Sequence, residues 1–449
     1  MMKEWTAKDK RRIAGRVKRL FTKKSFNVPK SIGDIPIEKY FARRLCLTES
    51  RTIFLTDSGL ENFKAVVDIL YLADLFDTLA DYSDIWSVWR GAVENWLSLG
   101  VEPSSAEEVV TEISGLVDKQ VDNYSFAVPI FGVELKDDSP LLLGNVRILK
   151  ISTNYFSEIK VDAHHIDVEK MCPPEQGRLW ITGSVRGTAR VAERKFSDQT
   201  TLTVGVLAIA AASMYELGAS KFRIGIEMKP QNFGNRVSWF SWSDTARSLT
   251  AHYASSSQQL LPVDEMLSQS SDMIAMIHRT LSIVQKDWGR TELEEAIARA
   301  VFWYSDAHRD SVLVMQFIKY WSCVEAFFSI EKDDITEAVT SGLAAQMIFG
   351  GFHFVPPNEY RKLKAEMAKF YGLRSQAMHR ASHNRITERD AARFSQLVAW
   401  LIISMVGLVT QGYTKLDEIK VETKRLDALA MKIDEHQSTG SSDAMSSAS

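Results

Sequence analysis

Apolar residues recur at helical spacing in the first part of the chain. The clearest stretch follows Asp57 and Ser58, which are good helix N-caps, and runs through LENFKAVVDILYLADLFDTLADY. Apolar residues three or four positions apart would form its buried stripe: Val66, Leu70, Ala73, Phe76 and Ala80. The tryptophans at 86, 89 and 96 suit packing better than a stacking platform. We therefore expect residues 1–120 to be a mainly helical region.

Strand-like patterns replace the helical ones over residues 121–245. SFAVPIFGVEL and NVRILKI are joined by the turn-rich KDDSP, which predicts a hairpin. RLWITGSVRG predicts a further strand, and a long apolar helix is expected after Ser197 and Asp198. FRIGIEMK and RVSWFSW flank PQNFGN, which predicts a second hairpin. A sheet packed against that helix makes this an α+β module.

The same region shows no catalytic signature. It contains no glycine-rich phosphate loop, no nucleophile elbow and no zinc-ligand spacing, and the adjacent His164 and His165 are expected at the surface. We therefore expect residues 121–245 to sense or bind something rather than to catalyse a reaction.

Helical spacing dominates again from about residue 260 to 430, after the connector SSSQQLLP. Helices are expected at about 262–286, 291–330, 334–349, 357–380 and 387–411. Thr387, with Asp390 three residues later, predicts a capping box at the start of the last one. The polar residues 435–449 predict a disordered tail. The expected fold class is α+β: an N-terminal helical and strand-containing module followed by an all-α helical bundle.

Composition favours a soluble cytoplasmic protein. The chain has 449 residues, a formal net charge of −3, and three cysteines, Cys46, Cys172 and Cys323, without metal or redox spacing. No apolar segment typical of a secretory signal follows the charged N-terminus. The apolar runs Leu202–Met214 and Leu397–Thr410 are shorter than the ~20 residues of a membrane helix. We expect both to be buried core helices and expect no membrane partner.

Two charged clusters each allow two readings. Eight lysines and arginines lie between Lys3 and Lys24, opposed only by Glu4 and Asp9, and would either neutralise phosphates or form a solvated helix face. Four aspartates recur at helical steps and would either bind Mg²⁺ or face solvent: Asp74, Asp77, Asp81 and Asp84. We favour the solvated face in both cases.

The segment LRSQAMHR carries the candidate chemistry. Arg374 offers a planar, permanently charged fork for phosphate oxygens, and His379 titrates near neutrality and can transfer protons. RNA cleavage by its own 2′-hydroxyl needs both functions and needs no metal or other cofactor. Five positions on an ideal helix rotate by about 500°, so the two side chains would diverge by about 140°. They converge only where the helix ends or distorts, or where a two-fold mate supplies a second pair.

The region from about 290 to 412 resembles the HEPN family, and in particular its Apea-like branch. FIKYWSCVEAFFS, which contains Glu325, is similar to the family's long aromatic-rich helix, and KFYGLRSQAMHR to the helix that carries its arginine–histidine motif. VPIFGVEL and LGNVRIL also resemble the module that often precedes this branch. The chain departs from the usual pattern at Ser375, where Asn, Asp or His is frequent, and at Arg380, where glycine is frequent.

The resemblance implies a bundle of four to five helices that forms a homodimer and cuts RNA, leaving a 2′,3′-cyclic phosphate and a 5′-hydroxyl. Arg374 would bind the scissile phosphate, His379 would transfer the proton and Ser375 would support them by a hydrogen bond to the phosphate. Glu325 would orient one of these groups, or would only cap a helix or form a salt bridge. His383 follows His379 at metal-ligand spacing, but no third ligand is visible, and no metal is expected.

The resemblance also implies a role in bacterial anti-phage defence or as a toxin. An activator or phage-derived trigger would then be a further partner. Two other hypotheses stay open. The bundle would bind RNA or a nucleotide without cutting it, or it would be a structural dimerisation domain with Arg374 and His379 on its surface.

Overall fold

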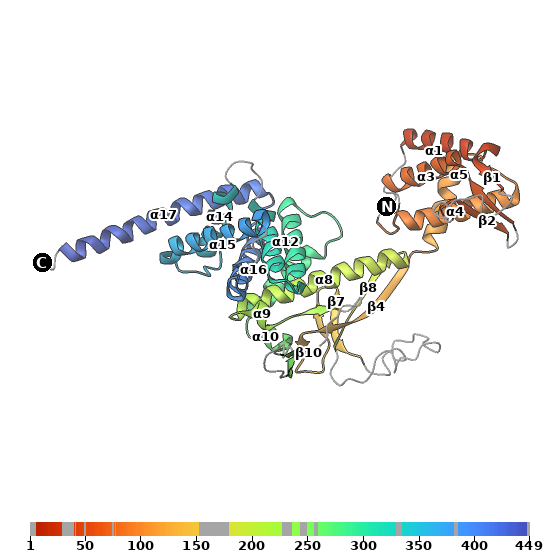
Figure 1. The fold of residues 1–449 in the computed structure, drawn as a ribbon. Coiled ribbons are helices and arrows are strands. Elements are labelled where there is room, and N and C mark those ends of the chain that lie inside the picture. Colours follow the sequence, from red (N-terminus) through yellow and green to blue (C-terminus); the bar gives the residue numbers. More distant parts are fainter. Residues whose placement is uncertain are drawn as a thin grey trace. The chain divides into compact units, whose positions relative to one another are not determined.

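The chain is described by a computed structural model. The structure describes residues 6–28, 40, 42–48, 51–73, 76, 78–151, 179–226, 236–242, 249–255, 259–328, 335–380 and 385–446; within these, side chains are not described for residues 236–255, 335–336, 379–380, 431 and 433–446. The chain is mixed α and β, with small sheets and a helical C-terminal region (Figure 1). It divides into two compact units, residues 1–126 with 184–196, and residues 127–183 with 197–449.

The boundaries of these two units differ from those of the three regions predicted from the sequence, 1–120, 121–245 and 260–430. The first boundary, at Phe126, lies close to residue 120. The strand-rich segment after it shares a compact unit with the C-terminal helices, and residues 184–196 return to the first unit.

In the described part of residues 1–126, four α-helices pack with a small antiparallel sheet. The sheet has the strand order β1-β3-β2. Its elements are α1 (Ala7–Leu20), β1 (Phe26–Asn27), β2 (Arg44–Thr48), β3 (Arg51–Leu55), α3 (Asp57–Leu72), α4 (Tyr82–Leu99) and α5 (Ala106–Asp118), with the short 3₁₀ helix η1 (Lys23–Ser25). One cluster of buried apolar side chains joins all four α-helices, and Phe63, Trp86, Trp89 and Trp96 make ring contacts within it. The prediction that the tryptophans pack is confirmed.

The helix expected to run to Tyr82 is shorter than predicted. It begins after Thr56, whose hydroxyl accepts a hydrogen bond from the Gly59 amide, and ends at Leu72. The chain then turns, and Asp81 caps a new helix, α4, in a reciprocal capping box with Asp84. In the sequence, apolar residues keep helical spacing beyond Leu72, so the pattern did not reveal that the helix ends there. Val66 and Leu70 are nevertheless fully buried, as expected.

The capping box also explains two of the four aspartates. The Asp81 carboxylate accepts from the amides of Ser83 and Asp84, and Asp84 accepts from the Thr188 hydroxyl at 2.5 Å. These bonds fix the start of α4, so Asp81 and Asp84 have a structural role rather than a solvated one. Asp74 and Asp77 lie outside the described residues.

Residues 184–196 complete the first unit by binding to the start of α4. The Thr188 amide donates to the Leu79 carbonyl at 2.8 Å, and the rings of Phe126 and Phe196 stack at 4.9 Å. Thr188 also starts α8 (Ala189–Met214), because its hydroxyl accepts from the Val191 amide. The long helix therefore begins about ten residues before the expected start at Ser197 and Asp198.

A five-stranded sheet has the strand order β6-β7-β8-β4-β9. Its strands are β4 (Asp122–Phe131), β6 (Leu141–Leu143), β7 (Val146–Lys150), β8 (Leu179–Gly187) and β9 (Gly225–Ile226). The strand predicted from RLWITGSVRG is confirmed as β8. The first predicted hairpin is wrong, because β7 pairs with β6 and β8, and β8 separates it from β4. Strand pairing joins segments far apart in sequence, which local turn residues do not reveal.

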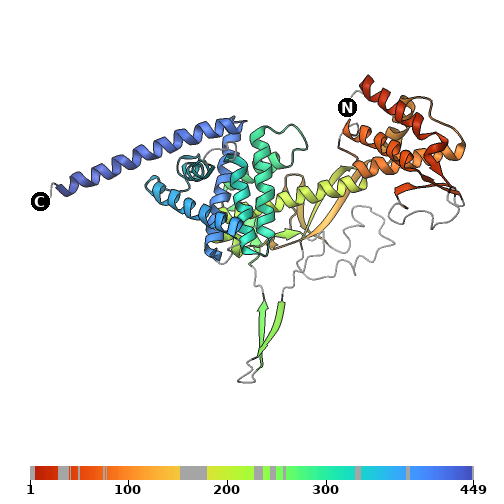
Figure 2. The ribbon, with the colours of Figure 1, turned by 45° about the horizontal axis from the view of Figure 1, so that its top comes forward.

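The second predicted hairpin is also wrong. β9 pairs with β4, whereas β10 (Arg236–Trp242) pairs antiparallel with β11 (Leu249–Ser255), as Figure 2 shows. The segment taken as a connector contains β12 (Leu261–Pro262), which pairs in parallel with β5 (Val133–Glu134). His164 and His165 lie outside the described residues.

The C-terminal helices form a bundle (Figures 1 and 2). They are α9 (Gly218–Lys221), α10 (Val263–Ser268), α11 (Ser271–Val284), α12 (Glu292–Arg309), α13 (Leu313–Phe328), α14 (Ile335–Phe349), η3 (Pro357–Glu359), α15 (Tyr360–Arg380), α16 (Glu388–Thr410) and α17 (Leu416–Ser446). The predicted capping box of Thr387 and Asp390 is confirmed. Gly205 of α8 lies so close to α12 that a Cβ would come within 2.9 Å of Ser305.

Two helix predictions differ from the structure. The helix expected over 291–330 is two helices, because Asp310 adopts an extended backbone and its side chain accepts from the Val312 amide. The tail expected to be disordered from residue 435 continues α17 as far as Ser446. Extending an existing helix costs less free energy than starting one, so polar composition alone did not predict the end of α17.

α16 is the one helix in the described part of the chain that is long and apolar enough to cross a membrane. Of its most apolar window, 72% is buried inside the protein, as in the core helix of a soluble protein. The apolar run Leu202–Met214 lies within α8, where Val204 and Val206–Ala212 are buried.

Candidate functional site

The candidate site begins on the buried face of α15. Leu363, Met367 and Phe370 are at most 2% exposed and recur at steps of three and four, so they form the apolar stripe of this helix. Arg374 follows four residues after Phe370 on the same stripe. The helix therefore aims Arg374 toward its neighbours in the bundle, and the side chain is only 22% exposed.

Glu325 of α13 pairs with this arginine. Its Oε1 lies 2.6 Å from the Nη2 of Arg374, and the Glu325 side chain is 26% exposed. Glu325 stands four residues after the buried Trp321 on its own helix, which places it on the face toward α15. The structure thus brings together two of the residues that the sequence singles out.

An aromatic pair supports the arginine from the side. The Arg374 guanidinium lies 5.7 Å from the ring centroid of Tyr371, which contacts Trp321 edge-to-face at 5.5 Å. A cation near an aromatic face gains about 0.5–1 kcal/mol at a half-exposed site. Sequence reasoning missed Tyr371 as a partner, although its position three residues before Arg374 on one helix was the available signal.

One donor of Arg374 has no partner among the described residues. Its Nε is shielded from solvent and makes no hydrogen bond there, and the same holds for the Nε1 of Trp321. A buried donor without an acceptor costs about 1–3 kcal/mol.

His379 lies one and a half turns further along α15, in its last turn. The helix is unbroken from Tyr360 to Arg380, so the backbone does not end before His379. The side chains of His379 and Arg380 lie outside the described residues, as does His383. Ser375 is half-buried beside Arg374.

Further cations lie where α15 approaches the start of α16. Lys369 contacts the Asp390 carboxylate at 2.9 Å, and Arg385 donates to the Gln376 side chain at 3.2 Å. Burial alone would raise the pKa of Asp390. The hydrogen bonds from Thr387 and Lys369 lower this pKa by more than burial raises it, so the pKa lies below its ordinary value. Asp390 is therefore an anion that fixes the N-terminus of α16 and holds Lys369.

His308 of α12 is a second buried titratable group in the bundle. It is 2% exposed, and its Nε2 accepts from the Ile224 amide at 3.1 Å. Burial, together with Arg223 and Arg309, lowers its pKa from 6.5 to about 4. His308 is therefore neutral at pH 7 and has a structural role. Among the described side chains, no group of three histidines, cysteines or acids is arranged to hold a metal.

Comparison with protein-family models, with curated proteins and with solved structures finds no match to this chain.

Proposed function

We propose that the bundle α11–α17 is a HEPN-type domain that cuts RNA without a metal, with Arg374 and His379 as its catalytic residues. The observation that carries this proposal is the state of Arg374: a cation that is 22% exposed, oriented by Glu325 and flanked by the ring of Tyr371. A scissile phosphate would bind the exposed part of its guanidinium. The fixed charge would then stabilise the additional negative charge of the transition state.

His379 would carry the proton. A histidine titrates near neutrality and can act as general base toward the 2′-hydroxyl or as general acid toward the leaving 5′ oxygen. The products would be a 2′,3′-cyclic phosphate and a 5′-hydroxyl.

The unbroken helix favours a site shared between two chains. On a continuous α15, Arg374 and His379 diverge by about 140° and differ by about 7.5 Å in height, so one chain does not direct both onto the same phosphate. A two-fold homodimer places Arg374 of one chain opposite His379 of the other. Anti-phage defence or toxin activity in the cytoplasm, released by an activator or phage-derived trigger, is the role that accompanies this proposal.

The direct test is cleavage of total RNA by the full-length protein in EDTA, with analysis of the new ends. Arg374→Ala and His379→Ala should each lose at least about a hundredfold in rate, the usual size of one general acid–base or charge-stabilising contribution. Lys362→Ala is the matched control, because Lys362 is an exposed cation on the same helix. Cleavage that is equal in all four proteins would reject this site.

A mixing experiment tests the shared site. Co-expressed Arg374→Ala and His379→Ala chains form mixed dimers in which one of the two sites is intact, so about a quarter of the wild-type activity should return. If each chain formed its own site, every mixed dimer would lack one residue in both sites and no activity would return. RNA binding that depends on Arg374, without any cleavage, would favour the alternative of a non-catalytic RNA- or nucleotide-binding dimerisation module.

A further inference from the structure

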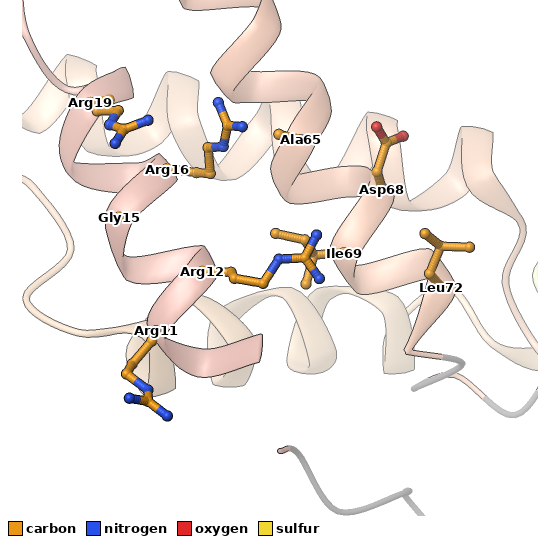
Figure 3. A pocket seen from close by; sticks show the side chains of 9 residues that line it. All are labelled: Arg11, Arg12, Gly15, Arg16, Arg19, Ala65, Asp68, Ile69 and Leu72. Carbon is orange, nitrogen blue, oxygen red and sulfur yellow. The ribbon is translucent and has the colours of Figure 1, made fainter. Parts of the chain in front are cut away.

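A second, unrelated site lies in the first unit, between α1 and α3. The two helices enclose an open groove of about 470 Å³ (Figure 3). This volume lies within the range of about 300–1,000 Å³ that is typical of small-molecule sites. The groove belongs to the basic N-terminal segment, for which the sequence left a phosphate-binding surface and a solvated helix face as alternatives.

Arginines from α1 give the groove a strong positive charge. Four of them line it, and Asp68 is the one acid among the described residues of the lining. Arg12, Arg16 and Arg19 recur at steps of four and three, which places them on one face of α1. In Figure 3 Arg12 extends toward α3, whereas Arg11 points away from it.

Arg16 is held in place before any ligand binds. Its Nη1 donates to Glu61 and to the buried Asn62, each at 3.1 Å, and Asn62 donates in turn to the Ser58 carbonyl. Among the described residues Arg12 makes a loose pair with Asp9 at 3.6 Å, in which the Arg12 side chain is 57% exposed. Exposed pairs of this kind are worth less than about 1 kcal/mol, so an anionic ligand can replace them.

The remaining wall is apolar and leaves open space beside Gly15. Ala65, Ile69 and Leu72 of α3 line it, and Leu72 is 78% exposed. Gly15 of α1 also faces the groove, and a Cβ built on it would meet no atom within 4 Å. Among the described residues, the lining contains no aromatic ring.

We propose that this groove binds a phosphorylated small molecule of nucleotide size. Its phosphates would bind Arg12, Arg16 and Arg19, because arginine forks match phosphate oxygens. Its ring would lie against Ile69 and Leu72. A single-stranded RNA is a poorer match, because sequence-tolerant RNA sites combine a long basic track with stacking aromatic side chains.

Calorimetric titration of the full-length protein with ATP and with GTP tests this assignment. Saturable binding of at least one of them is expected, with inorganic pyrophosphate binding at least about tenfold more weakly because it lacks the ring. The double variant Arg12→Gln/Arg19→Gln should weaken nucleotide binding by at least about tenfold. Its matched control is Lys8→Gln/Lys18→Gln, which removes the same charge from exposed positions of α1 outside the groove and should change affinity less than twofold.

A steric variant distinguishes binding inside the groove from attraction by the charge of the arginines alone. Gly15→Leu fills the open space, retains every arginine and improves helix propensity, so it should abolish nucleotide binding without lowering the melting temperature. Gly115→Leu, at another exposed helical glycine with open space beside it, is the control. Arg374→Ala should leave nucleotide binding unchanged, which keeps this result independent of the ribonuclease proposal.

Three results would overturn the assignment. They are the absence of binding by either nucleotide, equal weakening by the arginine and lysine pairs, and unchanged binding in Gly15→Leu. A 12-nucleotide single-stranded RNA titrated in parallel identifies the other class of ligand: RNA binding that is lost in Gly15→Leu, without nucleotide binding, would reassign the groove to RNA.

Discussion

The stability of the second unit should fall as pH decreases from 7 to 5, and His308 should cause most of this change. Its pKa is 6.5 in the unfolded chain and about 4 in the folded protein, chiefly because it is buried. Between these values the unfolded chain binds more protons than the folded one, so stability rises with pH. The stability that neutral His308 provides is complete above pH 6.5 and is lost as pH falls toward 4.

The size of the effect follows from the two pKa values. A difference of one in pKa corresponds to 1.36 kcal/mol, so the whole effect is about 3 kcal/mol, and the part lost between pH 7 and pH 5 is about 2 kcal/mol. Carboxylates with lowered pKa values, such as Asp390, weaken the fold only at more acidic pH. The interval from pH 5 to 7 therefore reports mainly on histidine.

His308→Gln isolates the contribution of this residue. A glutamine side chain can accept the hydrogen bond from the Ile224 amide but does not titrate. Hydrogen exchange of α12 peptides, corrected for intrinsic rates and measured in low urea, gives the free energy of opening for this unit alone, which avoids treating a chain of two units as one transition. Wild type should lose about 2 kcal/mol more than the variant over this interval. Parallel pH profiles for the two proteins would refute the argument from burial.

Three other measurements test the packing directly. Gly205→Ala should destabilise the second unit by about 1–3 kcal/mol, because the new Cβ would lie 2.9 Å from a side-chain carbon of α12. Gly372→Ala, which has open space around it, should stabilise the unit by about 0.5–1 kcal/mol. The same exchange assay must show effects of opposite sign for the two variants. Thr291→Ala removes a capping box and should cost about 1 kcal/mol, read as faster exchange at the start of α12. Iodoacetamide should label the exposed Cys46 in the native protein but not Cys323, whose pKa is raised well above its ordinary value by burial; peptide mapping that finds equal labelling would contradict this.

Local signals in the sequence predicted local structure well. The Thr387 and Asp390 pair defined the start of α16, and the alternation in RLWITGSVRG defined β8. Strand partners were not predictable in this way, because β8 reaches its place beside β4 across a long intervening segment. The break at Asp310 was hidden because apolar residues continue at helical spacing on both sides of it.

The candidate site was predicted in part. Arg374 and Glu325 were identified from the sequence, and their contact follows from the packing of α13 against α15. The cation–π contact with Tyr371 and the unsatisfied Nε depend on side-chain packing that spacing does not encode. The groove between α1 and α3 depends on the absence of a side chain at Gly15, which a count of charges does not reveal.

The discontinuous first unit has a consequence for synthesis on the ribosome. The chain leaves this unit at Phe126 and completes it only with residues 184–196, seventy residues later at Phe196. At about 5–20 residues per second, the nascent N-terminal helices wait roughly 3–12 seconds for Thr188 to bind Leu79 and Asp84. During that interval the apolar cluster of residues 13–117 can form, but the start of α4 lacks the bonds from Thr188, so a product truncated before residue 184 would carry an unfinished first unit.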